Sequence, residues 1–149
     1  PGAGHLLAFN NGYGGPAGTA SSVVEIEPQL APDGSYLLQR GDSYGPASPS
    51  WEYRGHPPSS FAAEFLSGAQ RLADGNTLVT AGPQGRIFEV NSRGNVVWEY
   101  TSPFSGRAPN PAGDPPRALF RAVFVASDHP ALAGRELRPL EPQPRLEDR

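Results

Sequence analysis

The stretch Ala69-Gln70-Arg71-Leu72-Ala73-Asp74-Gly75-Asn76-Thr77-Leu78-Val79-Thr80 decides the fold class of this chain. Its Asp-Gly pair separates two short apolar runs, which is the strongest short-range signal of a β-hairpin. Two more apolar runs follow at 87–90 and 96–100, with Arg93-Gly94-Asn95 as the turn between them. We therefore predict four antiparallel strands, at 69–72, 77–80, 87–90 and 96–100, in about thirty residues, the size of one propeller blade.

The last predicted strand has a two-residue period. Side chains alternate between the faces of a strand, so Val96, Trp98 and Tyr100 are expected on one face and Val97 and Glu99 on the other.

Three motifs of this unit occur earlier in the chain, in the same order. The pairs are Gly4-His5-Leu6-Leu7-Ala8 with Gly75-Asn76-Thr77-Leu78-Val79, Val23-Val24-Glu25-Ile26 with Ile87-Phe88-Glu89-Val90, and Trp51-Glu52-Tyr53 with Trp98-Glu99-Tyr100. Their separations fall along the chain, which insertions in the loops of the first copy explain, notably through 31–50. Chance similarity rarely preserves order, so we interpret the chain as an internal repeat.

The fold class we predict is all-β, a partial β-propeller of about two four-stranded antiparallel blades. Residues 1–126 hold the repeats, with copy one at about 4–55 and copy two at about 61–103. A further strand is expected at about 118–126, because Phe120, Ala122 and Phe124 alternate there with Leu119, Arg121, Val123 and Val125. Residues 127–149 are expected to be a loose, Pro-rich charged tail.

Two blades do not close a ring, since propellers typically have at least four blades. Exposed sheet edges would remain on both sides, and we expect the remaining blades, or a second chain, to cover them. This leads us to expect that the sequence is part of a longer propeller.

Composition narrows the function classes. The 149 residues include 18 Gly and 18 Pro, which suit turns between short strands. A formal net charge of −3 provides no basic footprint for nucleic acid or for an anionic membrane, so neither partner is expected. There is no Cys, and the acidic residues Asp33 and Asp42 lack the spacing of a calcium loop, so we predict no metal and no cofactor.

The same residues resemble the aryl-sulfate sulfotransferase-like (arylsulfotransferase) propellers. The resemblance rests on Ser67 to Leu78 followed by Gly85 to Val90 and Val96 to Tyr100, on Leu6 to Gly12 with Val23 to Pro28, and on Ala118 to Ala122 before Asp128-His129-Pro130. It implies a six-bladed propeller with a central funnel, of which this chain holds the last part. It also implies sulfuryl transfer between phenols through a sulfated histidine, and a periplasmic or extracellular location.

The chain departs from that pattern at the catalytic position. Relatives with a His-Asp pair before the Gln-x-Leu stretch would place it at Ser67-Gly68, where there is no imidazole. Among the histidines present, His56 is our first catalytic candidate, because loops joining blades line the funnel mouth, and His129 is the second. Each precedes a proline, and the alternative for each is an exposed residue in an extended loop. His5 is expected to make a turn or strand-edge contact.

Three arginines are candidates for binding a sulfate ester, because guanidinium matches oxyanions bidentately. They are Arg71, Arg86 and Arg121. The alternative is ion pairing on strand faces with Glu25, Glu89 or Glu99. Trp51 and Trp98 recur at equivalent positions, which favours packing between blades over stacking on an aromatic substrate.

Two hypotheses for function follow. The first is an arylsulfotransferase-like enzyme that moves a sulfuryl group between phenolic compounds, with an aryl sulfate or a phenol as its small-molecule partner. The second is a non-catalytic β-propeller scaffold that presents its loops to a ligand or a protein. The missing His-Asp pair favours the scaffold for this chain taken alone.

Overall fold

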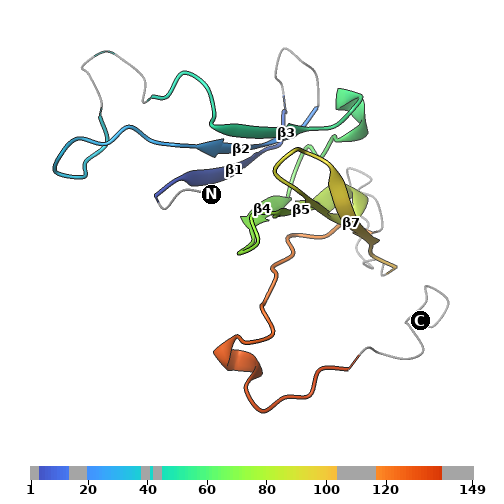
Figure 1. The fold of residues 1–149 in the computed structure, drawn as a ribbon. Coiled ribbons are helices and arrows are strands. Elements are labelled where there is room, and N and C mark those ends of the chain that lie inside the picture. Colours follow the sequence, from blue (N-terminus) through green and yellow to red (C-terminus); the bar gives the residue numbers. More distant parts are fainter. Residues whose placement is uncertain (1–3, 14–19, 38–40, 42–44, 104–116, 139–149) are drawn as a thin grey trace.

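The computed structural model describes residues 4–13, 20–37, 41, 45–103 and 117–138. These residues form two antiparallel β-sheets that do not close on one another, and they contain no α-helix. Sheet I has the strands β1 (Leu6–Asn10), β2 (Ser22–Ile26) and β3 (Trp51–Arg54), and sheet II has β4 (Gly68–Arg71), β5 (Thr77–Ala81), β6 (Arg86–Val90) and β7 (Val96–Thr101). Three short 3-10 turns are η1 (Pro58–Ser60), η2 (Gly82–Gln84) and η3 (Pro130–Leu132). Figure 1 shows the two sheets lying against one another.

Sheet II confirms the four strands predicted for copy two, each within one residue of its expected start and end. The conformation of the turn between β4 and β5 explains why the Asp74-Gly75 pair is a strong signal of a hairpin. Gly75 has a positive φ of 90°, which glycine adopts without strain, and the Asp74 carboxylate accepts the amide of Asn76 at 3.0 Å. The β6–β7 turn also has a glycine with a positive φ, Gly94 at 79°, but there the side chain of Asn91 accepts hydrogen bonds from the amides of Arg93 and Asn95.

Sheet I differs from the prediction of a four-stranded copy one. The described part of 4–55 contains three strands and an isolated bridge between Leu30 and Tyr36. Prolines at 28, 32, 46 and 49 interrupt the long connection from β2 to β3, and proline cannot donate to a β-ladder.

The three strands of sheet I have the same registers as the last three strands of sheet II. Leu7 faces Glu25 and Glu25 faces Trp51 in sheet I, and the same offsets place Leu78 opposite Glu89 and Glu89 opposite Trp98 in sheet II. By these registers β1 corresponds to β5, β2 to β6 and β3 to β7. Sheet I therefore has no counterpart of β4 among the described residues.

A β-bulge corrects the predicted faces of β7. Between Glu89 and Val90 the register shifts, so that Glu89 pairs with Trp98 but Val90 pairs with Val96. Paired residues lie on the same face, so Val96 shares the face of Val90, and Trp98 and Tyr100 lie on the opposite face. A two-residue period cannot reveal a bulge, which inserts one residue without a distinctive local pattern.

The core lies between the two sheets. Its buried members are Val23, Tyr53, Phe61, Ala63, Val79, Ala81, Phe88 and Val90. Phe61, from the connection between the sheets, is fully buried and contacts Phe88 edge-on, with ring centroids 5.6 Å apart. Tyr53 completes the ring cluster at 5.4 Å from Phe61 and 5.6 Å from Phe88. These aromatic contacts hold sheet I against sheet II.

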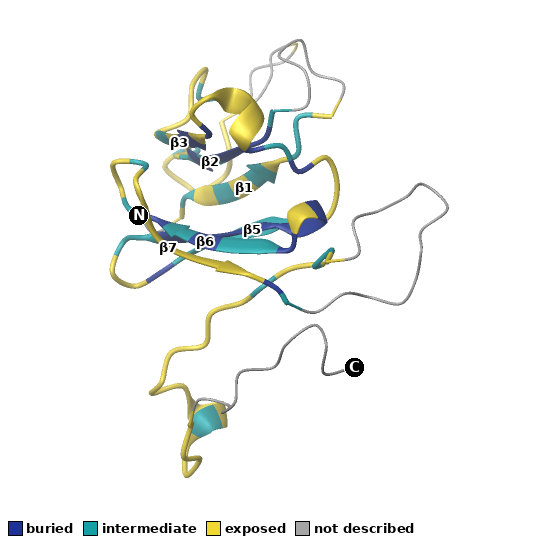
Figure 2. Cartoon of the chain, turned by 90° about the vertical axis from the view of Figure 1, so that its right-hand side faces the viewer, coloured by how far each residue is buried: buried dark blue, intermediate teal, exposed yellow. Residues whose placement is uncertain are grey.

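The strand expected at 118–126 is not present. The segment is extended, but its hydrogen bonds go to side chains and turns rather than to a neighbouring strand: the Ala122 amide donates to Thr80 Oγ1 at 3.0 Å, and Phe124 exchanges hydrogen bonds with the Gln70 side chain. An alternating apolar pattern forms a strand only where a second edge lies beside it. In Figure 2 the following described residues run away from both sheets, and η3 is their only regular element in 127–138. The remaining predicted tail, 139–149, lies outside the described residues.

Candidate functional site

The two sheets border a cleft of about 570 Å³. Its walls come from β3 and η1 on one side and from η2, β6 and the start of β7 on the other. The lining residues are Tyr53, Arg54, His56, Ser60, Gln84, Arg86, Gly94, Asn95 and Val96. The cleft thus brings together two sequence-predicted site residues, His56 and Arg86, that are thirty positions apart in the chain.

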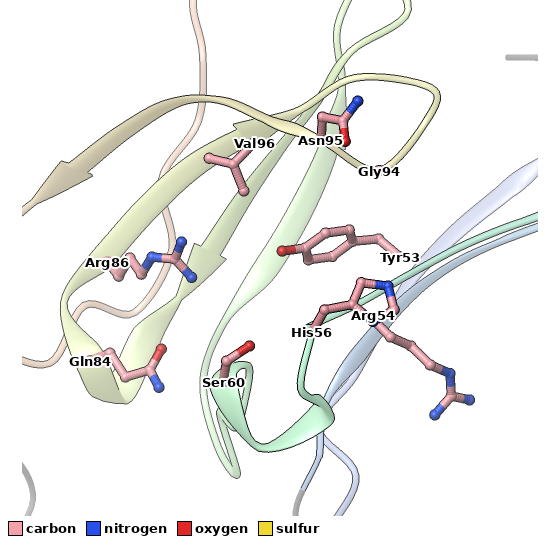
Figure 3. A pocket seen from close by; sticks show the side chains of 9 residues that line it. All are labelled: Tyr53, Arg54, His56, Ser60, Gln84, Arg86, Gly94, Asn95 and Val96. Atoms are coloured by element: carbon pink, nitrogen blue, oxygen red, sulfur yellow. The ribbon is translucent and has the colours of Figure 1, made fainter.

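His56 lies two residues after the end of β3, where the chain leaves sheet I. The His56–Pro57 peptide is cis, and Pro58 begins η1, so the backbone turns directly after the imidazole. The residue is exposed, as expected for a loop position before proline. Figure 3 shows His56, Ser60 and Tyr53 around the same open space.

Arg86 is the cation on the opposite wall. Its side chain lies over the ring of Phe88, with Cζ 4.1 Å from the centroid, and its Nη2 is 2.8 Å from Oε2 of Glu99. The hydrogen bond from Arg86 lowers the pKa of Glu99 below its usual value. Because a guanidinium has five N–H donors, one carboxylate contact through Nη2 leaves capacity for a second anion.

Arg54 contributes less to the centre of the cleft. It pairs with Glu52 on its own strand at 2.7 Å, and this hydrogen bond raises the pKa of Arg54. In Figure 3 its guanidinium points away from Arg86 and His56.

Tyr53 forms the floor between the two walls. Its ring is packed in the aromatic core and the residue is 7% exposed, and burial raises the pKa of its phenol above the usual value. The phenol therefore remains a neutral hydrogen-bond donor at physiological pH. Together, a guanidinium, a phenolic O–H and an imidazole can hold the oxygens of a small anion and offer it a nitrogen nucleophile.

The other sequence-predicted site residues lie elsewhere. Arg71 is bound to Glu25 and Thr77 and lies 4.5 Å from the centroid of Trp51, in a separate crevice between the sheets. Arg121 lies against Gly68, where an added Cβ would meet its Cδ at 3.1 Å.

His129 belongs to the described part of the tail. There it accepts the Ala131 amide at 3.1 Å and caps η3. It is exposed and does not line the cleft.

The alternative to sulfate binding by the three arginines was ion pairing with a glutamate. Two of the arginines form such a pair, Arg71 with Glu25 and Arg86 with Glu99. His5 also contacts Glu25, with Nδ1 2.7 Å from Oε1, which agrees with the strand-edge contact expected for it. Trp51 packs against the core as predicted, but Trp98 is 49% exposed.

Sequence reasoning missed Tyr53, Ser60 and Gln84 as lining residues. Tyr53 carried the signal of a repeated aromatic, which points to packing and does not reveal that its hydroxyl reaches a cleft. Ser60 and Gln84 lie in 3-10 turns whose relation depends on how the sheets pack, so no local pattern marks them.

The described residues contain no group of three His, Asp or Glu side chains that could hold a metal ion. The same part of the chain has no apolar helix of the length that a membrane span needs. Within the same residues, the histidine–carboxylate pairs involve His5, and none involves His56. Comparison of the chain with protein-family models, with curated proteins and with solved structures finds no match.

Proposed function

We propose that this chain is part of an arylsulfotransferase-like β-propeller, and that the cleft between its sheets binds an aryl sulfate and transfers the sulfuryl group to a phenolic acceptor. The observation that carries the proposal is the meeting of His56 and Arg86 in one cleft with the Tyr53 phenol. The sequence motifs of the repeats resemble that family, and this resemblance is the reason for choosing sulfate esters among small anions.

The arrangement of the sheets supports the propeller. Two antiparallel sheets with equal registers lie against one another, and β4, the first strand of sheet II, lies beside β1. Radial stacking of sheets around a channel places the inner strands of neighbouring sheets closest to one another, and β1, the counterpart of β5, is the innermost strand of sheet I among the described residues. On this proposal β4 is the innermost strand of its blade.

Sulfuryl transfer in the cleft would take place in two steps. A neutral imidazole nitrogen of His56 attacks sulfur, the N–S bond forms, and the S–O bond to the aryl group breaks to release a phenolate. A second phenol then attacks the same sulfur through its oxygen, the N–S bond breaks, and its proton passes to the released phenolate through solvent. Arg86 and the Tyr53 hydroxyl would hold the sulfuryl oxygens throughout, since such donors act most strongly where charge is held away from water.

The test is acceptor-dependent release of nitrophenol from 4-nitrophenyl sulfate. His56→Gln should abolish release, because an amide cannot act as the nitrogen nucleophile. His129→Gln is the matched control, since it also replaces a histidine before proline but lies outside the cleft. Arg86→Met keeps the aliphatic stem over Phe88 and should weaken substrate binding, whereas Arg138→Met in the tail should not. Circular dichroism establishes that each variant is folded.

The scaffold hypothesis makes a different prediction for the same samples. If the folded wild-type chain releases no nitrophenol but binds 4-nitrophenyl sulfate, and Arg86→Met loses that binding, the cleft is a binding site without transfer activity. If neither release nor binding is measured, the proposed function is wrong.

A further inference from the structure

The two arginines that line the cleft each have a carboxylate partner. Arg86 pairs with Glu99, from β6 to β7, at 2.8 Å, and Arg54 pairs with Glu52 on β3 at 2.7 Å. The formal charges cancel within each pair. An anion that enters the cleft therefore meets arginines whose positive charge is already balanced, and the position of each carboxylate decides how strongly that anion is repelled.

Glu99 lies on the face of sheet II that borders the cleft. The register pairs it with the core residue Phe88, and paired residues share a face. Burial is the main cause of the raised pKa of the Tyr53 phenol, and the charge of Arg86 lowers that pKa while the charge of Glu99 raises it. Both charges therefore reach the floor of the cleft, where an anion would be held.

The second pair lies on the other side of its strand. Glu52 and Arg54 flank Tyr53 along β3, and neighbouring side chains of a strand point to opposite faces. Figure 3 shows the Arg54 guanidinium turned away from the open space, whereas the guanidinium of Arg86 and the hydroxyl of Tyr53 point toward it. Of the two carboxylates, Glu99 is thus the one that acts on an anion in the cleft.

Stacking on Phe88 places the Arg86 side chain independently of Glu99. The guanidinium Cζ lies 4.1 Å from the ring centroid, and the Arg86 side chain is 22% exposed, against 46% for Glu99. Such a contact orients the plane of a guanidinium without a carboxylate. What Glu99 adds at the cleft is therefore mainly a negative charge beside the donors that would hold an anion.

The strength of the repulsion depends on the charge of the ligand. Two anions that share one guanidinium lie about 6 Å apart, and in water-like surroundings one unit of charge at that distance changes an affinity about threefold. A ligand with two negative charges is repelled twice as strongly, so its affinity is lowered about tenfold. A sulfate monoester has one negative charge, whereas a phosphate monoester approaches two at neutral pH. Glu99 can therefore distinguish two ester classes of nearly equal shape.

We infer that Glu99 is a charge filter for the cleft: it leaves Arg86 able to hold a singly charged sulfate ester and disfavours doubly charged anions such as phosphate monoesters. The inference rests on the proposed function in taking the cleft as the anion site, and it does not require that transfer occurs. Glu99 determines specificity through its charge, without touching the ester.

Calorimetric titration with benzenesulfonate and phenylphosphonate tests this. The two ligands have nearly the same shape but differ by one charge at a pH where the phosphonate is fully ionised. Neither group can be transferred, because each is bonded to carbon. Glu99→Gln keeps an oxygen that can accept the Arg86 hydrogen bond but removes the charge. It should tighten the binding of benzenesulfonate about threefold and of phenylphosphonate about tenfold, and both gains should shrink as salt is added.

Glu52→Gln is the matched control, since it removes the carboxylate of the other arginine pair, and it should leave both affinities within about twofold of wild type. Glu99→Asp keeps the charge and should keep the wild-type ratio of the two affinities. The inference is overturned if Glu99→Gln changes both affinities by the same factor or not at all, if Glu52→Gln has the same effect, or if the folded wild-type chain and Glu99→Gln bind neither ligand.

Nitrophenol release from 4-nitrophenyl sulfate, measured on the same samples, reports separately on the proposed function. Transfer without charge discrimination would refute only the filter. Charge discrimination without transfer would refute only the enzyme.

Discussion

Replacing Phe88 with alanine should remove a large part of the free energy that holds sheet I to sheet II. Phe88 is fully buried, and its ring contacts Tyr53 at 5.6 Å and Phe61 at 5.6 Å, while Arg86 covers its face. Truncation of a buried phenylalanine to alanine costs about 3–5 kcal/mol, from lost transfer energy and the cavity left behind. Domains of ordinary stability have about 5–15 kcal/mol in total, so the loss is a substantial fraction.

The assay is urea denaturation followed by tryptophan fluorescence at a protein concentration where the chain is monomeric. With a slope of about 2 kcal/mol/M, a loss of about 4 kcal/mol lowers the midpoint by about 2 M. If Phe88→Ala proves too unstable to fold, Phe88→Leu should cost about 1–3 kcal/mol, since it removes two ring pairs that contribute about 0.5–1.5 kcal/mol each.

The matched control is Phe120→Ala. Phe120 is 77% exposed, and its hydrogen bond to Ser67 uses the backbone carbonyl, so its truncation should change stability by no more than about 0.5 kcal/mol. Equal destabilisation by the two substitutions would refute the placement of the core between the sheets.

Two further predictions concern charged and titrating groups in the same interface. Burial raises the pKa of the Tyr53 phenol in the folded chain above its value of about 10 in the unfolded chain. The contribution of the neutral, buried phenol to the free energy of unfolding is therefore fully present below pH about 10 and is lost as the pH rises through the pKa of the folded state. Denaturation at alkaline pH should therefore show stability falling, and Tyr53→Phe should reduce that fall; an unchanged slope would contradict the burial of the phenol. Glu25→Gln should cost about 3–5 kcal/mol in urea denaturation, because it leaves the 14% exposed Arg71 side chain without its carboxylate. Adding Arg71→Met to that variant should recover most of the loss, and a double variant as unstable as the single one would show that the ion pair is not the cause.

Local patterns were sufficient for sheet II. Its turns are made by Asp-Gly and Arg-Gly-Asn segments whose conformational preference does not depend on the rest of the chain, and its strands have the alternating apolar residues that such turns connect. For the same reason the ion pair of Arg86 with Glu99, on neighbouring strands of sheet II, could be anticipated from the sequence. The pair of Arg71 with Glu25 joins the two sheets, so it depends on how the sheets pack. The cleft could be predicted only in part, because His56 and Arg86 were named separately and nothing in the sequence placed them together.

The all-β class, the hairpins of sheet II and the three repeated motifs, which take equivalent register positions in the two sheets, could therefore be predicted from the amino-acid sequence alone. The packing of distant segments was needed to show that sheet I has three strands among the described residues, that a bulge turns Val96 toward the cleft, and that residues 119–125 lie on a sheet face without pairing as a strand. The reason is physical: a turn or an alternating strand depends on residues within a few positions, whereas a bulge, an unpaired edge and a cleft depend on which distant backbone lies alongside.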